Sequence, residues 1–332
     1  MINKDLDITI ESLDDDVKFS GENCVLITHA SYEDRCLAIC DCAFTSKVSA
    51  SILLSSEEYL QKGVYKAKSQ KLREFLSKVT SGDIIDVSAK KDKPVSTIAK
   101  IEEELRKIGG GDKDFLVDIS TFPRDRLICL FDYLLKLRGS GRKIEYIYAS
   151  PKGYGSECDK GWLTKGVRKI ESIPRFNGKQ RTRKETLLVM LLGHEGERSL
   201  ITLRNVEPDR LILITQGEAQ VNSSAREISQ SSNMSLINES RHLLLDEGSI
   251  ELSFFDPIKV DSVLEDIWCR HSNKYNIILS ISGTKLQVLG ALITCLRHRD
   301  IQIIYASPQS YNIENYSHNI GPKYRGRFLV KE

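Results

Sequence analysis

The chain carries one stretch of sequence twice: residues 144–154 read IEYIYASPKGY, and residues 301–311 read IQIIYASPQSY. Seven of the eleven positions are identical, at an offset of 157 residues. Two weaker matches precede this one in the same order. FLVDIS at 115–120 parallels IILSIS at 277–282, and Arg35-Cys36-Leu37 parallels Arg198-Ser199-Leu200. Self-similarity in a constant order predicts an internal duplication with small differences in loop length.

Each copy alternates short apolar runs with helical patterns. Helices are expected after the first strand through 37–44, at 94–108 between Pro94 and the glycines at 109–111, at 124–137, at 260–271 and at 285–297. The strands expected in the first copy are 24–28, 51–54, 83–87, 115–119 and 144–148. Those expected in the second are 187–192, 211–214, 250–254, 276–281 and 301–305. Buried strands that alternate with helices are typical of a parallel sheet. The sequence therefore predicts an α/β fold of two tandem Rossmann-like domains, each a mainly parallel, doubly wound sheet.

The repeat also sets the expected domain boundaries. Residues 1–22 form an N-terminal extension, 23–184 the first copy, and 185–332 the second. A polar, basic stretch follows the first copy at 156–184, and the tail 312–332 follows the second in the same place. We expect each to extend its own domain. The run GKQRTRK at 178–184 favours a solvated loop, with phosphate contact as the alternative.

Composition excludes several classes of protein. The chain has 332 residues, with 48 basic and 46 acidic side chains, so its net charge of +2 does not by itself imply a nucleic-acid partner, and local basic patches remain an open alternative. No apolar run approaches the roughly 20 residues that span a membrane, and the acidic N-terminus lacks a signal-peptide core. The eight cysteines show no paired CxxC spacing, which fits free thiols in the cytoplasm. We expect a cytoplasmic protein without metal, cofactor or membrane contact.

Polar residues follow the first, fourth and fifth strands of each copy. If strands one and four are neighbours, these residues meet at the topological switch point, where ligands bind. In the first copy they are His29, Ser31, Glu33, Arg35, Asp118, Ser120, Arg124 and Ser150. In the second they are His194, Glu195, Arg198, Ser280, Ser282, Thr284, Lys285 and Ser307.

Structural roles are the alternatives for several of these residues. Ser31, Ser120 and Ser282 are placed to cap the next helix. Asp118, at the end of a buried strand, needs a partner, and Arg35 or Arg124 would make a structural ion pair. The repeated Ser-Pro would end the fifth strand, because proline lacks the donor that a ladder needs. Termination does not account for the tyrosines that flank it.

Residues 277–292, IILSISGTKLQVLGAL, resemble the fourth-strand segment of CARF domains, the CRISPR-associated Rossmann-fold sensors. In that family an apolar strand runs into a Gly-Thr-Lys turn that opens a helix. The opening of the second copy, from 187 onward, also resembles the first βαβ unit of the family. The first copy has DISTFPR where the second has SISGTK, so it resembles the family only through the second copy.

The resemblance implies a particular kind of ligand. CARF domains pair around a two-fold axis and bind cyclic oligoadenylates in the shared cleft, and the SAVED module fuses two such units. Lys285, Arg198 and Arg35 would then bind phosphate, as helix N-termini do. Serine and threonine hydroxyls would contact ribose. No nuclease or winged-helix motif is recognisable, which predicts either a separately encoded effector or a sensor that hydrolyses its own ligand.

Three hypotheses follow from the sequence. The first is a nucleotide-sensing regulatory subunit of a prokaryotic antiviral defence system. The second is a hydrolase or transferase that acts on a nucleotide or nucleic-acid phosphate, with His29, Glu33 and Asp118 as its acid–base groups. The third is a scaffold with vestigial clefts. The sequence leaves a homo-oligomer open.

Overall fold

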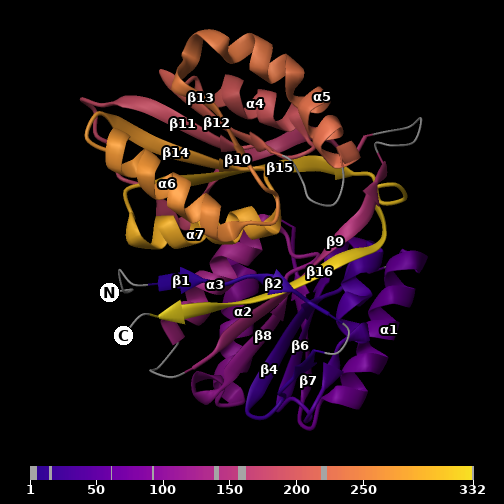
Figure 1. Cartoon of the computed structure of the whole chain (residues 1–332). Helices are drawn as coiled ribbons and strands as arrows, with labels where there is room; N and C mark the ends of the chain where they lie inside the picture. The colour runs from indigo at the N-terminus through magenta and orange to yellow at the C-terminus, as the bar shows by residue number, and fades with distance from the viewer. Residues whose placement is uncertain are drawn as a thin grey trace. The chain divides into compact units, whose positions relative to one another are not determined.

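The computed structural model describes residues 6–14, 17–60, 62–91, 93–137, 142–155, 162–217 and 223–330. The chain forms two compact units (Figure 1). The first unit combines Lys4–Gly153 with Ser317–Glu332, and the second is Tyr154–Tyr316. The C-terminal segment thus belongs to the unit that the N-terminal half builds.

The sheet of the first unit has the order β1-β16-β9-β8-β4-β6-β7. Its strands are β1 (Leu6–Ile8), β4 (Cys24–His29), β6 (Ala50–Ser56), β7 (Ile84–Ala89), β8 (Asp114–Asp118), β9 (Ile144–Tyr154) and β16 (Ser317–Val330), with β2 (Glu11–Ser12) beside β16. The pairs β8–β4, β4–β6, β6–β7 and β8–β9 are parallel, and β1 pairs antiparallel with β16. Short strands β3 (Lys18–Phe19) and β5 (Ala43–Phe44) pair separately.

The helices of this unit are η1 (Asp34–Asp41), η2 (Glu57–Tyr59), α1 (Gly63–Val79), α2 (Pro94–Lys107), η3 (Gly110–Asp112) and α3 (Arg124–Leu137). Helix α2 begins with Pro94 at its first turn and is followed by Gly109 in the left-handed region, as the sequence predicted. The helix expected after the first strand is instead the 3₁₀ helix η1. It ends at Asp41, Cys42 is extended, and Ala43 and Phe44 then pair with β3.

The sheet of the second unit has the order β10-β15-β14-β11-β12-β13. Its strands are β10 (Thr164–Asn177), β11 (Glu185–Leu191), β12 (Arg210–Gln216), β13 (Leu244–Leu252), β14 (Tyr275–Ile281) and β15 (Gln302–Tyr311). Its helices are α4 (Gly196–Val206), α5 (Ser223–Ser240), η5 (Arg241–Leu243), α6 (Pro257–His271) and α7 (Lys285–Arg297). Helices α6 and α7 cover one face of the sheet, and α4 and α5 the other (Figure 1).

The five repeated strands have the same order in both units. Numbered along each copy, they run 5-4-1-2-3, as β9-β8-β4-β6-β7 and as β15-β14-β11-β12-β13. This is the doubly wound order in which strands one and four flank the switch point. The structure therefore shows two Rossmann-like α/β units, with strands one and four adjacent in each.

The strands that follow each copy are exchanged between the two sheets, which corrects the expectation that each extension stays in its own domain. Strand β10 follows the first copy but pairs antiparallel with β15, whereas β16 follows the second copy and lies between β1 and β9. Aromatic side chains pack β16 against the first unit: the Phe328 ring centre lies 4.9 Å from that of Phe131 and 6.1 Å from that of Tyr146.

The Ser-Pro pair also does not end the fifth strand. Strands β9 and β15 both run through it, to Tyr154 and Tyr311. The exchanged strand pairs there, since Val167 of β10 lies opposite Pro308. No helix in the described ranges is both long enough and apolar enough to cross a membrane.

Candidate functional site

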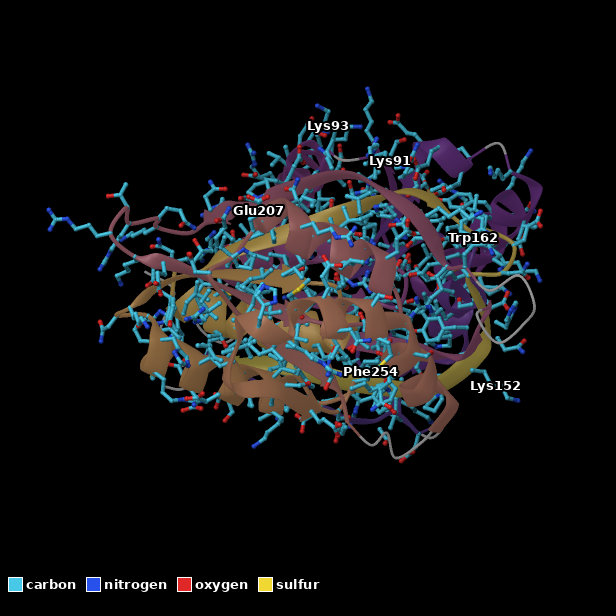
Figure 2. The ribbon with its side chains drawn as sticks, turned by 90° about the horizontal axis from the view of Figure 1, so that it is seen from above. Lys91, Lys93, Lys152, Trp162, Glu207 and Phe254 are labelled. Atoms are coloured by element: carbon cyan, nitrogen blue, oxygen red, sulfur yellow. The ribbon has the colours of Figure 1, made fainter. Side chains whose placement is uncertain are left out.

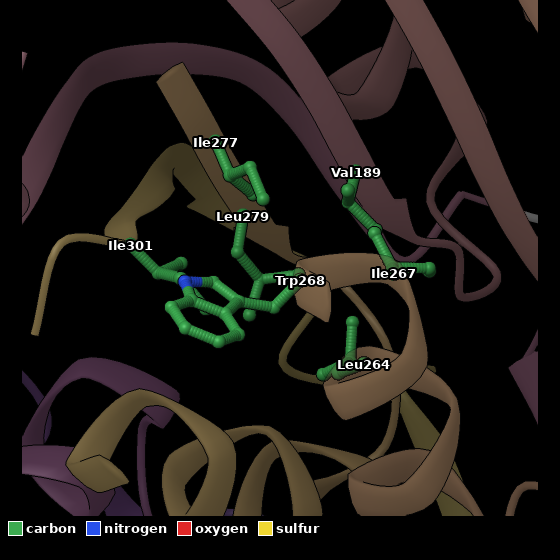
Figure 3. Close-up of a pocket in the computed structure, with 7 residues that line it drawn as sticks. All are labelled: Val189, Leu264, Ile267, Trp268, Ile277, Leu279 and Ile301. Carbon is green, nitrogen blue, oxygen red and sulfur yellow. The ribbon is translucent and has the colours of Figure 1, made fainter. Parts of the chain in front are cut away.

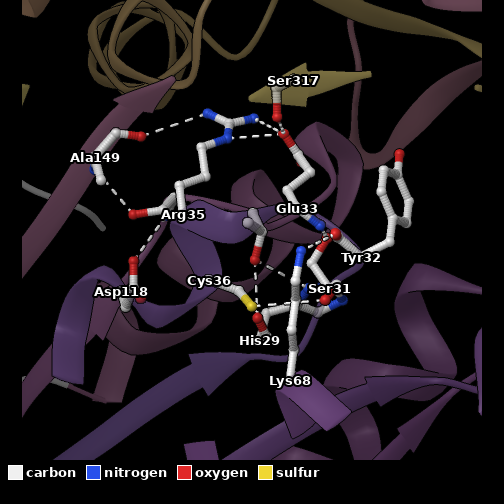
Figure 4. A network of polar contacts seen from close by, with 12 residues as sticks. His29, Ser31, Tyr32, Glu33, Arg35, Cys36, Lys68, Asp118, Ala149 and Ser317 are labelled. Atoms are coloured by element: carbon white, nitrogen blue, oxygen red, sulfur yellow. Dashed lines mark hydrogen bonds and ion pairs between the residues drawn. The ribbon is translucent and has the colours of Figure 1, made fainter. Parts of the chain in front are cut away.

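In the first unit, the loop after β4 places a buried ion pair at the carboxyl ends of the strands (Figure 4). The Arg35 Nη2 lies 2.7 Å from Glu33 Oε2, and its Nε donates to the same oxygen at 2.8 Å. The hydroxyl of Ser317, the first residue of β16, also donates to that oxygen at 2.7 Å. Arg35 is 3% exposed, so this pair lies in the interior rather than on an open surface.

The repeated tyrosine of the fifth strand completes this group. Burial raises the pKa of Tyr148, and the neighbouring Arg35 guanidinium opposes part of that rise. Arg35 also reaches the carbonyl of Ala149, at 3.5 Å. The Tyr-Ala pair of the Tyr-Ala-Ser-Pro signature therefore contacts the arginine that follows strand one.

The second unit contains the same arrangement. Glu195 and Arg198 form a buried ion pair, and Arg198 lies 5.6 Å from the centre of the Tyr305 ring. The hydroxyl of Thr164, the first residue of β10, donates to Glu195 at 2.8 Å. We call each set a Glu–Arg–Tyr cluster. The first comprises Glu33, Arg35, Tyr148 and Ser317, and the second comprises Glu195, Arg198, Tyr305 and Thr164.

The two clusters explain why the signature is repeated. A buried ion pair is tolerated when further hydrogen bonds satisfy its charges. In both units one such bond comes from the hydroxyl at the start of an exchanged strand. Sequence reasoning named the acidic and basic members but missed Ser317 and Thr164. The available signal was that both are hydroxyl residues at the start of a basic strand.

Asp118 and Ser120 connect β8 to β9. The Asp118 carboxylate accepts from the Ser120 amide at 2.9 Å, and the Ser120 hydroxyl accepts from the Ala149 amide at 2.9 Å. Asp118 is 2% exposed, whereas Arg124, the first residue of α3, is half-buried. Ser120 thus bonds to a neighbouring strand rather than capping α3.

His29 is the last residue of β4, and its ring is held from two sides. The hydroxyls of Thr121 and Ser56 lie 3.4 Å from Nδ1 and from Nε2. Ser31 accepts from the Glu33 amide at 3.3 Å, which fixes the turn after the strand. These residues are buried together, so they form a connected polar interior.

Ser150 and Ser307, the serines of the two signatures, have matching roles. Ser150 donates to the carbonyl of Pro322 on β16 at 3.0 Å. Ser307 donates to the carbonyl of Lys169 on β10 at 3.4 Å. Each serine therefore binds the backbone of the exchanged strand beside it.

The switch point of the second unit brings two loops together. The Ser282 amide donates to the Leu191 carbonyl at 3.1 Å. A Cβ atom on Gly193 would lie 2.4 Å from the Ser282 carbonyl oxygen, so only glycine allows the loop after β11 to approach so closely. Ser229 and Asn233 of α5 donate to the Gly193 carbonyl at 3.0 and 2.8 Å.

Helix α7 begins at this place with a capping box. The Thr284 hydroxyl accepts from the Gln287 amide at 3.2 Å, and the Gln287 side chain accepts from the Thr284 amide at 3.0 Å. Lys285, the first helical residue, is half-buried, whereas Ser282 before it is buried. The partial positive charge of the helix N-terminus adds to that of Lys285.

His194 lies beside this switch point. Its ring centre is 4.4 Å from that of Tyr154 and 5.2 Å from that of Phe254. Phe254, labelled in Figure 2, lies two residues after the end of β13, and its carbonyl accepts the Thr284 hydroxyl at 2.6 Å. His194 and His29 are not equivalent, because His29 ends its strand whereas His194 lies beyond the end of β11.

A small apolar pocket lies between α6 and the sheet of the second unit (Figure 3). It is lined by Val189, Leu264, Ile267, Trp268, Ile277, Leu279 and Ile301. This lining suits hydrocarbon and not phosphate. Within the described ranges, no group of three or more His, Cys, Asp or Glu side chains is placed to hold a metal ion.

Comparison with known proteins adds no functional assignment. No family model matches the chain, and no curated protein matches it. The chain is similar to a structure of the adenylation, ketoreductase and pseudo Asub domains of a keto acid-selecting NRPS module, at 11% identity and a TM-score of 0.26, over 90% of this chain. It spans 31% of that chain.

A second likeness is to A-type ketoreductases from a modular polyketide synthase. The identity is 11% and the TM-score 0.21, over 89% of this chain and 70% of that one. Likenesses this weak carry no argument about activity, so the functional conclusion depends on the geometry of the site.

Proposed function

We propose that this chain is a nucleotide-sensing regulatory protein of a prokaryotic antiviral defence system. It would bind a phosphate-bearing ligand at the carboxyl ends of its parallel strands and signal to a separately encoded effector. The observation that most supports this proposal is the switch point of the second unit, where the Gly193 loop meets the Ser282 turn beside Lys285. Ligands bind at such points in doubly wound sheets.

The chemistry of this switch point suits phosphate. Lys285 supplies a positive charge at the first residue of α7, and the helix N-terminus reinforces it. Gly193 brings backbone close to backbone, and Thr284 fixes the helix start. The resemblance of 277–292 to CARF domains points to a cyclic oligonucleotide as the phosphate-bearing ligand.

The enzyme alternative has weaker support. A general acid or base must reach a proton of the substrate. His29, Glu33 and Asp118 are all buried, and each is hydrogen-bonded to neighbouring residues. The first unit therefore offers a polar interior where the enzyme hypothesis needs an accessible site.

The Glu–Arg–Tyr clusters give a sensor a structural element to act upon. Each cluster joins the loop after strand one to the first residue of an exchanged strand. A ligand that prefers one arrangement of this loop would shift the population of the exchanged strand as well. Signalling to an effector needs such a coupled element.

A thermal-shift panel of cyclic and linear nucleotides on the full chain tests the proposal. A ligand at about 100 times its Kd should stabilise the fold by about 2.7 kcal/mol. Lys285→Ala should weaken binding by about 1.5–3 kcal/mol, the worth of hydrogen bonds to a charged group, which is roughly 10- to 150-fold. Lys259→Ala, an exposed lysine in the first turn of α6, is the matched control and should bind normally.

Two outcomes would overturn this assignment. The first is a panel in which no nucleotide shifts the melting temperature. The second is steady hydrolysis of a nucleotide that Asp118→Asn abolishes while binding persists. That result would establish the alternative, an enzyme with its active site in the first copy.

A further inference from the structure

The strongest concentration of basic charge in the chain follows the first copy. Residues 164–184 contain eight basic side chains and one acidic side chain, and the rest of the chain has 40 basic against 45 acidic. Strand β10 and the loop that follows it carry this excess. We call residues 164–184 the basic track.

The basic track lies at the edge of a sheet. Strand β10 ends the strand order of the second unit and has a neighbour, β15, on one side. At about 3.3 Å per residue, its 14 residues extend for up to about 46 Å. This exceeds the roughly 34 Å of one duplex turn.

The loop after β10 is held in a defined shape. The Asn276 side chain accepts from the Arg181 amide at 2.8 Å and donates to the carbonyls of Arg181 and Lys184 at 2.9 and 3.1 Å. The Lys179 amide donates to the Asp300 carbonyl at 3.1 Å. Yet Lys179, Arg181 and Arg183 are exposed. The backbone of this loop is thus fixed while its cations face solvent.

The strand itself presents further cations. Lys165, Arg168 and Arg175 are exposed along β10. Arg175 has a φ of 72°, in the left-handed region, within the irregular pairing between Ser172 and Asn177. Such irregularities redirect a side chain away from the regular alternation of a strand. The one acidic residue, Glu171, pairs with Lys169.

Protection of a sheet edge explains only part of this pattern. Lysines on an edge strand discourage pairing with other chains. The 179–184 loop has no strand edge to protect, yet it carries the densest charge and the most specific anchoring. A long, narrow line of cations instead matches an extended polyanion.

We propose that the basic track binds the phosphate backbone of a nucleic-acid duplex. A duplex is favoured over a single strand because the aromatic residues of this region offer no stacking platform. Phe176 is buried under the Arg299 guanidinium, and the Trp162 ring is covered by the Lys165 ammonium at 4.5 Å. Lys285, on which the nucleotide proposal depends, is not part of the basic track.

Fluorescence anisotropy with a labelled 24-base-pair DNA duplex tests this proposal on the full chain. Affinity should fall as salt rises, by about 0.9 logarithmic units per phosphate contact for each tenfold increase in salt. The triple variant Lys179→Ala, Arg181→Ala and Arg183→Ala should reduce that slope by about 2.7. The matched control, Lys66→Ala, Lys71→Ala and Lys78→Ala, removes three exposed lysines from α1 and should keep the slope.

A second variant, Asn276→Ala, and two other polyanions, an RNA duplex and polyglutamate, complete the test. Asn276→Ala keeps every charge but releases the loop, and it should weaken duplex binding several-fold with little change in slope. An RNA duplex of the same sequence identifies which duplex is preferred. Equal losses in both triple variants, or tighter binding to polyglutamate than to either duplex, would overturn the proposal.

Discussion

Replacing Arg35 by methionine tests whether the first Glu–Arg–Tyr cluster supports the fold. Methionine retains an apolar chain but removes the guanidinium, which leaves the Glu33 carboxylate buried with Ser317 as a donor. Breaking a buried pair in this way costs about 3–5 kcal/mol. Since the Ser317 hydroxyl still donates, we expect the lower end, about 3 kcal/mol.

Hydrogen exchange of the β4 amides in the full chain is the appropriate assay. Both tryptophans lie in the second unit, so tryptophan fluorescence does not report on β4. A loss of about 3 kcal/mol corresponds to exchange about 150-fold faster where global opening limits exchange. The second unit should keep its protection.

Two further variants complete the test. Arg106→Met breaks an exposed ion pair with Glu102, and should cost no more than about 0.5 kcal/mol. Adding Glu33→Gln to Arg35→Met removes the buried carboxylate charge that no longer has its arginine partner. The double variant should therefore recover part of the lost stability. If Arg35→Met exchanges like Arg106→Met, the ion pair does not stabilise the first unit.

Two other variants probe the same architecture. Ser317→Ala removes a hydrogen bond to the buried Glu33 carboxylate and should lower the unfolding free energy of the first unit by about 1.5–3 kcal/mol, measured by urea denaturation with circular dichroism. Ser310→Ala, exposed on β15, should have no measurable effect, and equal effects would refute the role of the hydroxyl. Gly193→Ala forces a Cβ against the Ser282 carbonyl and should lower the unfolding free energy of the second unit by about 1–3 kcal/mol, seen as a lower melting temperature. An unchanged melting temperature would show that this approach is not close in solution.

Much of the fold follows from local sequence. Buried strands give continuous apolar runs, and this is why β4, β8 and β14 were placed to within a residue or two. Helices α3 and α7 were predicted at their observed bounds. The interpretation of the site depended on strands one and four being neighbours, and the pairings show that they are in both units.

The strand exchange could not be predicted in this way. A strand's own pattern shows which face is buried but not which sheet edge it joins. Strands β10 and β16 each carry an Arg-Phe pair, at Arg175-Phe176 and Arg327-Phe328, so their sequences do not show which fifth strand each one joins. Helix α5 was missed because its serine-rich sequence has little apolar periodicity.

The candidate site was predicted in outline. Topology correctly placed the segments of Arg35, Asp118 and Ser150 at one end of a sheet. The burial of Glu33 could not be derived from the sequence, because it depends on the exchanged strand β16, whose Ser317 contacts Glu33. The arginines expected to bind phosphate are paired inside the units, and Lys285 is half-buried at the start of α7.

The most direct test of the sensor assignment is a calorimetric titration of a cyclic oligoadenylate into the full chain. We expect saturable binding that Lys285→Ala weakens at least about 10-fold and that Lys259→Ala preserves. Absence of heat with the unmodified chain, or equal affinity in all three proteins, would contradict a phosphate site at the start of α7.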